Sequence, residues 1–217
     1  MLTHEAGIPT PMMDRNGEQM ALIIYEARNV VDDRGRFVEF WEAQYDFEQK
    51  DDDFYRENVD QPLTEERIMG WFKWKNGMKL SERKERSVRQ NFVARLADLD
   101  TLPKEASASA LLDRFPDGGV IWRIFWLHCL QPGRFPIFDQ HVYRAMRFIL
   151  GGTTEEIPET DRLKIATYIN DYLPFYAEFD GLDRRSVDKA LWAFGKFLSG
   201  NKEFVRLASH FPFRGPR

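Results

Sequence analysis

The amino-acid sequence predicts an all-α protein. Apolar residues recur at three- and four-residue spacings along most of the chain, and helix caps or breakers stand at the ends of these segments. No alternating pattern typical of a strand runs for more than a few residues. With 217 residues, 43% of them apolar and 18 of them Phe, the chain can bury a substantial core. This length suits one large helical domain or two lobes that share a cleft.

The first half of the chain predicts three helices, each with an apolar side. Residues 34–49 carry aromatic side chains at i, i+3, i+4 and i+8, which places them on one helical face. Residues 63–77 follow a Thr64 cap and end in an Asn-Gly pair that favours a helix stop. Residues 80–103 have one apolar and one charged side. The aromatic residues of the first segment are Phe37, Phe40, Trp41 and Tyr45.

The second half predicts further helices separated by proline and glycine. Residues 102–119 contain a short helix that is ended by Pro116 and two glycines. Residues 120–130 are apolar on nearly all sides, so this helix must be buried. Three more helical segments follow at 139–152, 160–176 and 182–200.

Composition excludes several classes of protein and site. The formal net charge of -4 indicates no polyanion partner for the molecule as a whole, although residues 79–89 are locally basic, as a binding face or as a solvated helix side. The single Cys129 excludes an internal disulfide, a thiolate zinc site and an iron–sulfur cluster within one chain. No apolar stretch reaches the roughly 18 residues of a membrane span, and no secretory pattern opens the chain. We therefore expect a cytoplasmic protein with no membrane partner.

The segment "FPIFDQHVYRAM" contains one carboxylate, Asp139, at the point where an apolar approach turns into a helix. Pro136 restricts the backbone of this approach. Val142, Met146 and Ile149 then follow at helical spacing, and aspartate is among the best N-cap residues. A helix cap is the simplest interpretation of Asp139, and the sequence leaves open whether the same carboxylate also does chemistry.

Here the chain resembles the helix-hairpin-helix DNA base-excision glycosylases. "FPIFDQHVYRA" is similar to their "P-V-D-T-H-V-x-R" segment, with one extra residue between proline and aspartate. "FPDGGVIWRIF" resembles their hairpin "L-P-G-(V/I)-G", and "VDKALWAFGKF" resembles a later helix that runs into "F-G-(R/Q)". The three matches occur in the family's order and span about residues 115–197 of a single helical domain, residues 1–217.

The resemblance implies two helical lobes with a central cleft and assigns roles to particular residues. Asp139 would be the catalytic carboxylate at the helix N-terminus that faces the flipped nucleotide. The Gly118–Gly119 turn, with Arg123 and Arg144, would contact nucleic acid, so double-stranded DNA is the implied partner. The residues expected to line the base pocket or to give structural support are His141, Trp122 and Trp126.

The departures from the family pattern define the expected reaction. Bifunctional members carry a lysine nucleophile just after the hairpin, where this chain offers only Arg123, which cannot form a Schiff base. The resemblance is therefore to monofunctional members, which remove a damaged or mispaired base by hydrolysing its N-glycosidic bond with an aspartate and water. The family's cysteine cluster is absent, and no cofactor is expected.

A second interpretation is a non-enzymatic binding module of the same fold. The missing lysine, the acidic Asp117 in the hairpin and the net charge of -4 favour it. A basic rim around Asp139 would instead favour DNA, because phosphate neutralisation dominates affinity. The arginines whose positions decide this are Arg123, Arg134, Arg144, Arg147, Arg184 and Arg185.

Two further patterns have simpler explanations than a ligand site. A metal bound by Asp139, His141 and His128 is not expected, because residues at i and i+2 do not share a helical face. "KWKNG" (Lys73 to Gly77) would contact phosphate or simply form the basic, glycine-terminated end of a helix.

Overall fold

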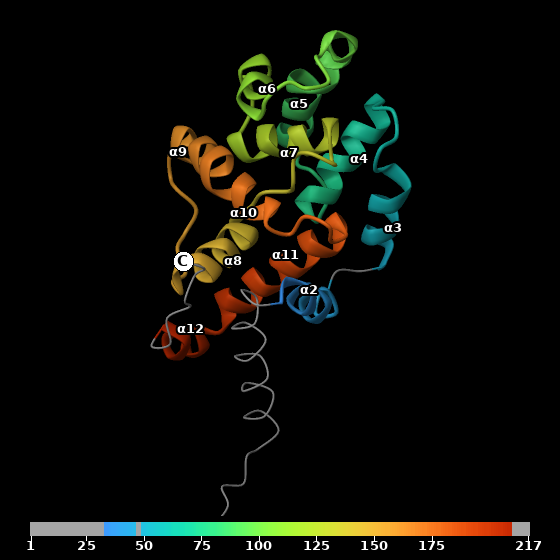
Figure 1. Cartoon of the computed structure of the whole chain (residues 1–217). Coiled ribbons are helices and arrows are strands. Elements are labelled where there is room, and N and C mark those ends of the chain that lie inside the picture. The colour runs from blue at the N-terminus through green and yellow to red at the C-terminus, as the bar shows by residue number, and fades with distance from the viewer. Residues whose placement is uncertain (1–32, 47–48, 210–217) are drawn as a thin grey trace, which may run out of the picture.

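The computed structural model describes residues 33–46 and 49–209, and within these ranges the chain forms helices and no strand, so the all-α prediction is confirmed (Figure 1). The first elements are α2 (Arg34–Glu42), α3 (Gln49–Asn58), α4 (Glu65–Asn76), α5 (Glu82–Asn91), the 3₁₀ helix η1 (Val93–Thr101) and α6 (Ala108–Arg114). The later elements are α7 (Val120–Leu130), α8 (Gln140–Gly151), α9 (Asp161–Thr167), the π-helical turn η2 (Tyr168–Tyr172), α10 (Leu173–Ala177), α11 (Arg184–Gly200) and α12 (Lys202–Ser209).

Side-chain caps begin several helices where the sequence predicted a start. The Thr64 hydroxyl accepts a hydrogen bond from the backbone N–H of Arg67 at the start of α4. Helix α4 ends at Gly77, whose φ of 69° is the left-handed conformation that glycine adopts at little cost. Asp183 caps α11 in the same way as Thr64 caps α4.

Two predicted helices are each divided in the structure. The segment 80–103 leaves α-helical geometry at Phe92, where the φ angle is -125°, and continues as η1. The segment 160–176 passes through the π-helical turn η2 just before Pro174. Proline has no N–H to donate to the preceding turn, so the regular ladder is interrupted there.

The buried apolar side chains form two clusters, one on each side of α7. The first cluster joins α2, α6 and the elements from α8 to α12, with α11 packed against both α8 and α2. The second cluster joins α3, α4 and α5, which occupy the upper and right-hand part of Figure 1. Helix α7 contributes Ile124 and Leu127 to the first cluster and Phe125 and Trp126 to the second.

Helices α8 and α11 approach each other very closely at Gly195. A Cβ atom at this position would lie 1.9 Å from the carbonyl oxygen of His141, far inside van der Waals contact. The glycine of the "AFGKF" segment therefore lets α11 pack directly on the first turn of α8. This contact fixes where α8 begins relative to the rest of the first cluster.

Candidate active site

Asp139 is the N-cap of α8, so the predicted helix start is confirmed. Its Oδ1 atom accepts hydrogen bonds from the backbone N–H groups of His141 at 2.8 Å and Val142 at 3.2 Å. Its Oδ2 atom lies 2.5 Å from the Nζ atom of Lys75 in the last turn of α4. Burial pushes the pKa of Asp139 upward, but the charge and hydrogen bond of Lys75 outweigh burial and hold the pKa below its ordinary value. The carboxylate is therefore both a cap and an ionised group.

The approach to Asp139 is held by buried hydroxyl groups from η2. Tyr168 donates a hydrogen bond to the carbonyl oxygen of Pro136 at 3.2 Å, and Tyr172 donates to that of Ile137 at 3.1 Å. Both tyrosines are fully buried. Because these bonds satisfy backbone acceptors inside the core, they fix the direction from which the chain enters the N-cap.

His128 on α7 holds the same approach from the other side. Its Nδ1 atom lies 2.8 Å from the carbonyl oxygen of Phe135, and since a carbonyl only accepts, Nδ1 carries the hydrogen. Its Nε2 atom then accepts from the hydroxyl of Tyr55 on α3 at 3.2 Å. Burial lowers the pKa of His128 to about 4, so the ring is neutral. Both ring nitrogens are used within the fold.

Lys75 was not predicted as a site residue. The only sequence signal was the basic helix end "KWKNG", for which phosphate contact or a favourable helix terminus were the two explanations. The structure adds a third role. The Lys75 ammonium group, at the end of α4, pairs with the carboxylate of Asp139, 64 residues further along the chain. Both side chains of the pair are largely buried, at 13% exposure for Lys75 and 17% for Asp139.

A pocket of about 70 Å³ opens beside this ion pair, at the junction of the two apolar clusters. Its aromatic wall consists of Tyr45, Trp74 and Trp192. Its polar wall contains four charged or ionisable side chains, namely Lys75, Asp139, Arg185 and Asp188. Such a mixture of aromatic surface with a few converging polar groups is typical of small-molecule sites.

Asp188 on α11 is the second carboxyl group at the pocket, and no motif in the sequence predicted a role for it. It is only 5% exposed, and its Oδ1 atom has no hydrogen-bond partner among the described residues. Burial raises the pKa of Asp188 to about 7, against the opposing effects of Arg185, Tyr176 and Lys75. The two carboxyl groups of one pocket thus have pKa values displaced in opposite directions.

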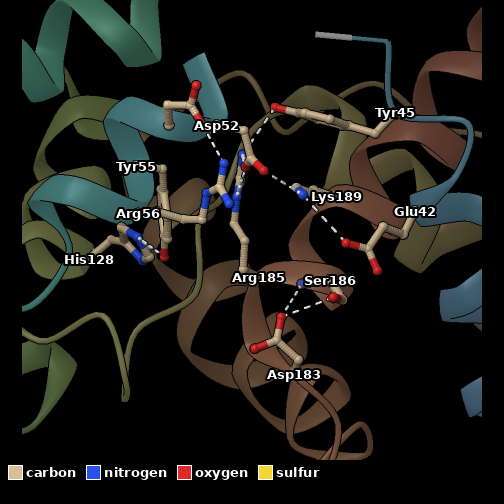
Figure 2. A network of polar contacts seen from close by, with 11 residues as sticks. Glu42, Tyr45, Asp52, Tyr55, Arg56, His128, Asp183, Arg185, Ser186 and Lys189 are labelled. Atoms are coloured by element: carbon tan, nitrogen blue, oxygen red, sulfur yellow. Dashed lines mark hydrogen bonds and ion pairs between the residues drawn. The ribbon is translucent and has the colours of Figure 1, made fainter. Parts of the chain in front are cut away.

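Arg185 anchors one side of the pocket through the network in Figure 2. Its guanidinium group bonds to the Asp52 carboxylate at 3.1 Å and lies over the ring of Tyr55, with 4.4 Å between the Cζ atom and the ring centroid. Lys189 also reaches Asp52, at 2.8 Å. The network joins α11 to α3 and places a paired cation against the aromatic wall.

The predicted nucleic-acid contacts lie away from this pocket. Gly118 and Gly119 form an exposed turn before α7, and Gly118 has a φ angle of 96°. Arg123 donates to the carbonyl oxygens of Phe115 and Leu112 at the end of α6. Arg144 is 7% exposed and donates to the carbonyl oxygen of Gly195 and to Glu156. Both guanidinium groups therefore form hydrogen bonds within the protein itself.

The aromatic residues predicted near the base pocket occupy the second apolar cluster instead. Trp126 is fully buried, and Trp122 packs on Phe72 at 5.0 Å between ring centroids. Neither residue lines the pocket. Of the two predicted roles, base contact and structural support, their positions favour structural support. His141 is half-buried, packs against Trp192 and leaves its Nδ1 atom without a hydrogen bond among the described residues.

The arginines considered from the sequence do not form a continuous rim around Asp139. Arg134 bonds to the carbonyl oxygen of Lys104, Arg147 pairs with Glu155, and Arg184 lies over the ring of Tyr176. Of the six arginines, Arg185 alone lines the pocket. The cations nearest to the site come instead from α4 and α11.

Within the described ranges, no three His, Cys, Asp or Glu side chains gather as metal ligands, and no helix is long and apolar enough to cross a membrane. Comparisons of the chain with protein-family models, with curated proteins and with solved structures found no match. The interpretation of the pocket therefore depends on its own geometry and chemistry.

Proposed function

We propose that this chain is a DNA base-excision glycosylase-like hydrolase that removes a damaged or mispaired base, with Asp139 as its catalytic carboxylate. The observation that carries the proposal is the position of this group: an ionised carboxylate at a helix N-terminus, on the wall of a partly aromatic pocket. Under this proposal the pocket is the base site between two helical lobes, each with its own apolar cluster.

The chemistry of N-glycosidic hydrolysis suits this carboxylate. As the bond from C1′ to the base nitrogen lengthens, positive charge develops on the sugar, and a nearby carboxylate in a water-poor site stabilises it. The backbone N–H groups of His141 and Val142 keep the Asp139 side chain fixed while it faces this charge. Lys75 keeps the group ionised, which a stabilising carboxylate must be.

The aromatic wall suits a nucleobase. A base that has left the helical stack needs a flat apolar surface to replace its lost stacking partners. Trp74 and Trp192 belong to different helices, α4 and α11, and both line the pocket. A cavity that holds benzene has about 150 Å³, so the pocket of about 70 Å³ must widen to admit a base.

Exposed cations beside α4 support a duplex as the substrate. The last turn of α4, the turn from α4 to α5 and the first turns of α5 carry basic side chains at the surface, and Lys75 comes from the same end of α4. Neutralisation of phosphates is the main source of affinity for DNA. These exposed residues are Lys73, Lys79, Arg83, Lys84 and Arg86.

The test distinguishes a catalytic role of Asp139 from its role as a helix cap. Asp139→Asn keeps a good N-cap but removes the negative charge, and Asp183→Asn makes the same exchange at the cap of α11. Affinity is measured for a duplex that carries a cationic abasic-sugar analogue and for an unmodified duplex at the same salt concentration. We expect wild type and Asp183→Asn to prefer the analogue strongly and Asp139→Asn to lose that preference. Equal preference in all three proteins would refute a catalytic Asp139.

A second candidate function is duplex binding without cleavage. It is favoured by the engagement of both oxygens of Asp139 with groups of the protein itself, namely Lys75 and the first turn of α8. The same experiment distinguishes this candidate, because a pure binding module holds both duplexes with similar affinity and Asp139→Asn does not change their ratio.

A further inference from the structure

Two carboxyl groups line the pocket, and their surroundings favour opposite protonation states. Asp139 receives two backbone N–H groups and the ammonium group of Lys75, which all stabilise its ionised form. Asp188 is nearly completely buried, and one of its oxygens has no hydrogen-bond donor among the described residues. A pair of acidic groups whose environments separate their pKa values in this way is the usual basis of an acid and an anion acting together in one site.

The hydrogen bonds around Asp188 favour its protonated form. The Tyr176 hydroxyl donates its single hydrogen to the carbonyl oxygen of Arg184 at 2.8 Å, so it does not donate to Asp188 in this arrangement. The Oδ1 atom of Asp188 has no hydrogen-bond partner among the described residues. A buried carboxyl group without donors is more stable neutral than ionised.

We infer that Asp188 is the general acid that protonates the departing base in the reaction proposed above, while Asp139 stabilises the charge on the sugar. This inference rests on the proposed function of the pocket. The bond between C1′ and the base nitrogen breaks, its electron pair leaves with the base, and the proton of Asp188 moves to a nitrogen or oxygen of that base. Water adds its oxygen to C1′ and releases its proton through the Asp139 carboxylate to solvent, and Asp188 regains a proton from solvent.

Tyr176 suits the state of Asp188 that follows proton transfer. The Asp188 carboxylate then needs a donor, and rotation of the Tyr176 hydroxyl from the Arg184 carbonyl toward Asp188 supplies one. Because Asp188 itself lines the pocket, its proton does not have to cross the apolar core to reach the base.

Several ionisable groups from other elements act on Asp188. The cations are Arg185 on α11 itself and Lys75 on α4, and the anion is Asp139 at the start of α8. The hydroxyl groups are those of Tyr55 on α3, Tyr168 and Tyr172 in η2, and Tyr176 on α10, and burial raises the pKa of each of them. The tyrosines stay neutral at physiological pH, so Lys75, Arg185 and Asp139 set the field in which Asp188 titrates.

The test compares leaving bases that differ in their need for a proton. Single-turnover base release is measured between pH 5 and pH 9 from duplexes that carry hypoxanthine, 8-oxoguanine, uracil or N7-methylguanine. The last base already bears a positive charge and leaves without an acid. The proteins are wild type, Asp188→Asn and the control Asp183→Asn, which makes the same exchange on the same helix outside the pocket. Thermal unfolding of each variant establishes that it is folded.

We expect Asp188→Asn to slow the release of the neutral bases about 100-fold or more, as the loss of a general acid does. Release of N7-methylguanine should change less than about tenfold, and the wild-type rate for neutral bases should fall as the pH rises past the pKa of Asp188, which is about 7. An Asp188→Asn protein as fast as wild type on a neutral base at pH 6 would overturn the inference and leave the glycosylase proposal standing. Wild type that releases none of the four bases would overturn both.

Discussion

Asp188 should make the stability of this protein depend on pH in a direction opposite to that of most carboxylates. Its pKa is raised from 3.8 to about 7 in the folded state, so between these values the folded chain holds a proton that the unfolded chain has lost. Stability is therefore greatest below this window and falls as the pH rises through it. Each pH unit is worth about 1.4 kcal/mol, so the full window costs about 4 kcal/mol.

The variant Asp188→Asn isolates this contribution. Asparagine resembles the protonated side chain in shape and, like it, carries a hydrogen-bond donor, but it does not titrate. Relative to wild type, the variant should gain about 3 kcal/mol between pH 5 and pH 8, because about two pH units of the window lie in that range.

The assay is urea unfolding at pH 5 and pH 8, followed by tryptophan fluorescence, with Asp183→Asn as the control. The difference between wild type and control should be the same at both pH values. If the difference between wild type and Asp188→Asn also stays constant, Asp188 does not hold a proton in the folded protein. The assignment of Asp188 as the acid would then lose its physical basis, whatever the protein does to DNA.

Three further perturbations test the geometry of the site. Gly195→Ala should destabilise the fold by about 3 kcal/mol or more, since its Cβ atom would lie 1.9 Å from a backbone oxygen; a melting temperature equal to that of wild type would contradict this packing. Lys75→Met should cost about 2 to 3 kcal/mol near neutral pH by leaving the Asp139 carboxylate unpaired. Because the partner lowers the pKa of Asp139, this cost should begin to shrink as the pH falls through the ordinary aspartate pKa and vanish below the lowered one, and unfolding curves at pH 3 and pH 7 check the sign. Tyr172→Phe should cost about 1 to 2 kcal/mol by freeing a buried carbonyl before α8, and urea midpoints that match wild type would exclude that role.

Local chemistry made the helix starts predictable. Thr64 and Asp139 are residue types that satisfy backbone N–H groups at a helix start, and Gly77 adopts the left-handed conformation that ends a helix. Each of these features depends on a few neighbouring residues, so the sequence alone was enough to find them. The division at Pro174 was also encoded locally, because a proline inside a helical pattern removes a donor.

The polar wall of the site was not predictable in the same way. Lys75 meets Asp139 across 64 residues, and Asp188 reaches the pocket from a helix that the sequence identified only by its apolar pattern. Such meetings depend on how helices pack, which periodicity within one helix does not determine. Trp122 and Trp126 were chosen for their closeness to the hairpin, but the orientation of α7 directs them into the second cluster.

Helix α7 has a consequence for protein engineering. Because it supplies Ile124 to one apolar cluster and Phe125 to the other, and because the pocket lies where the clusters meet, the two cores are mechanically joined through this helix. Substitutions deep in either core and away from α7 should change thermal stability without altering the distances at the pocket. Substitutions along α7 should shift the two walls of the pocket relative to each other. The width of the pocket could therefore be adjusted through this helix.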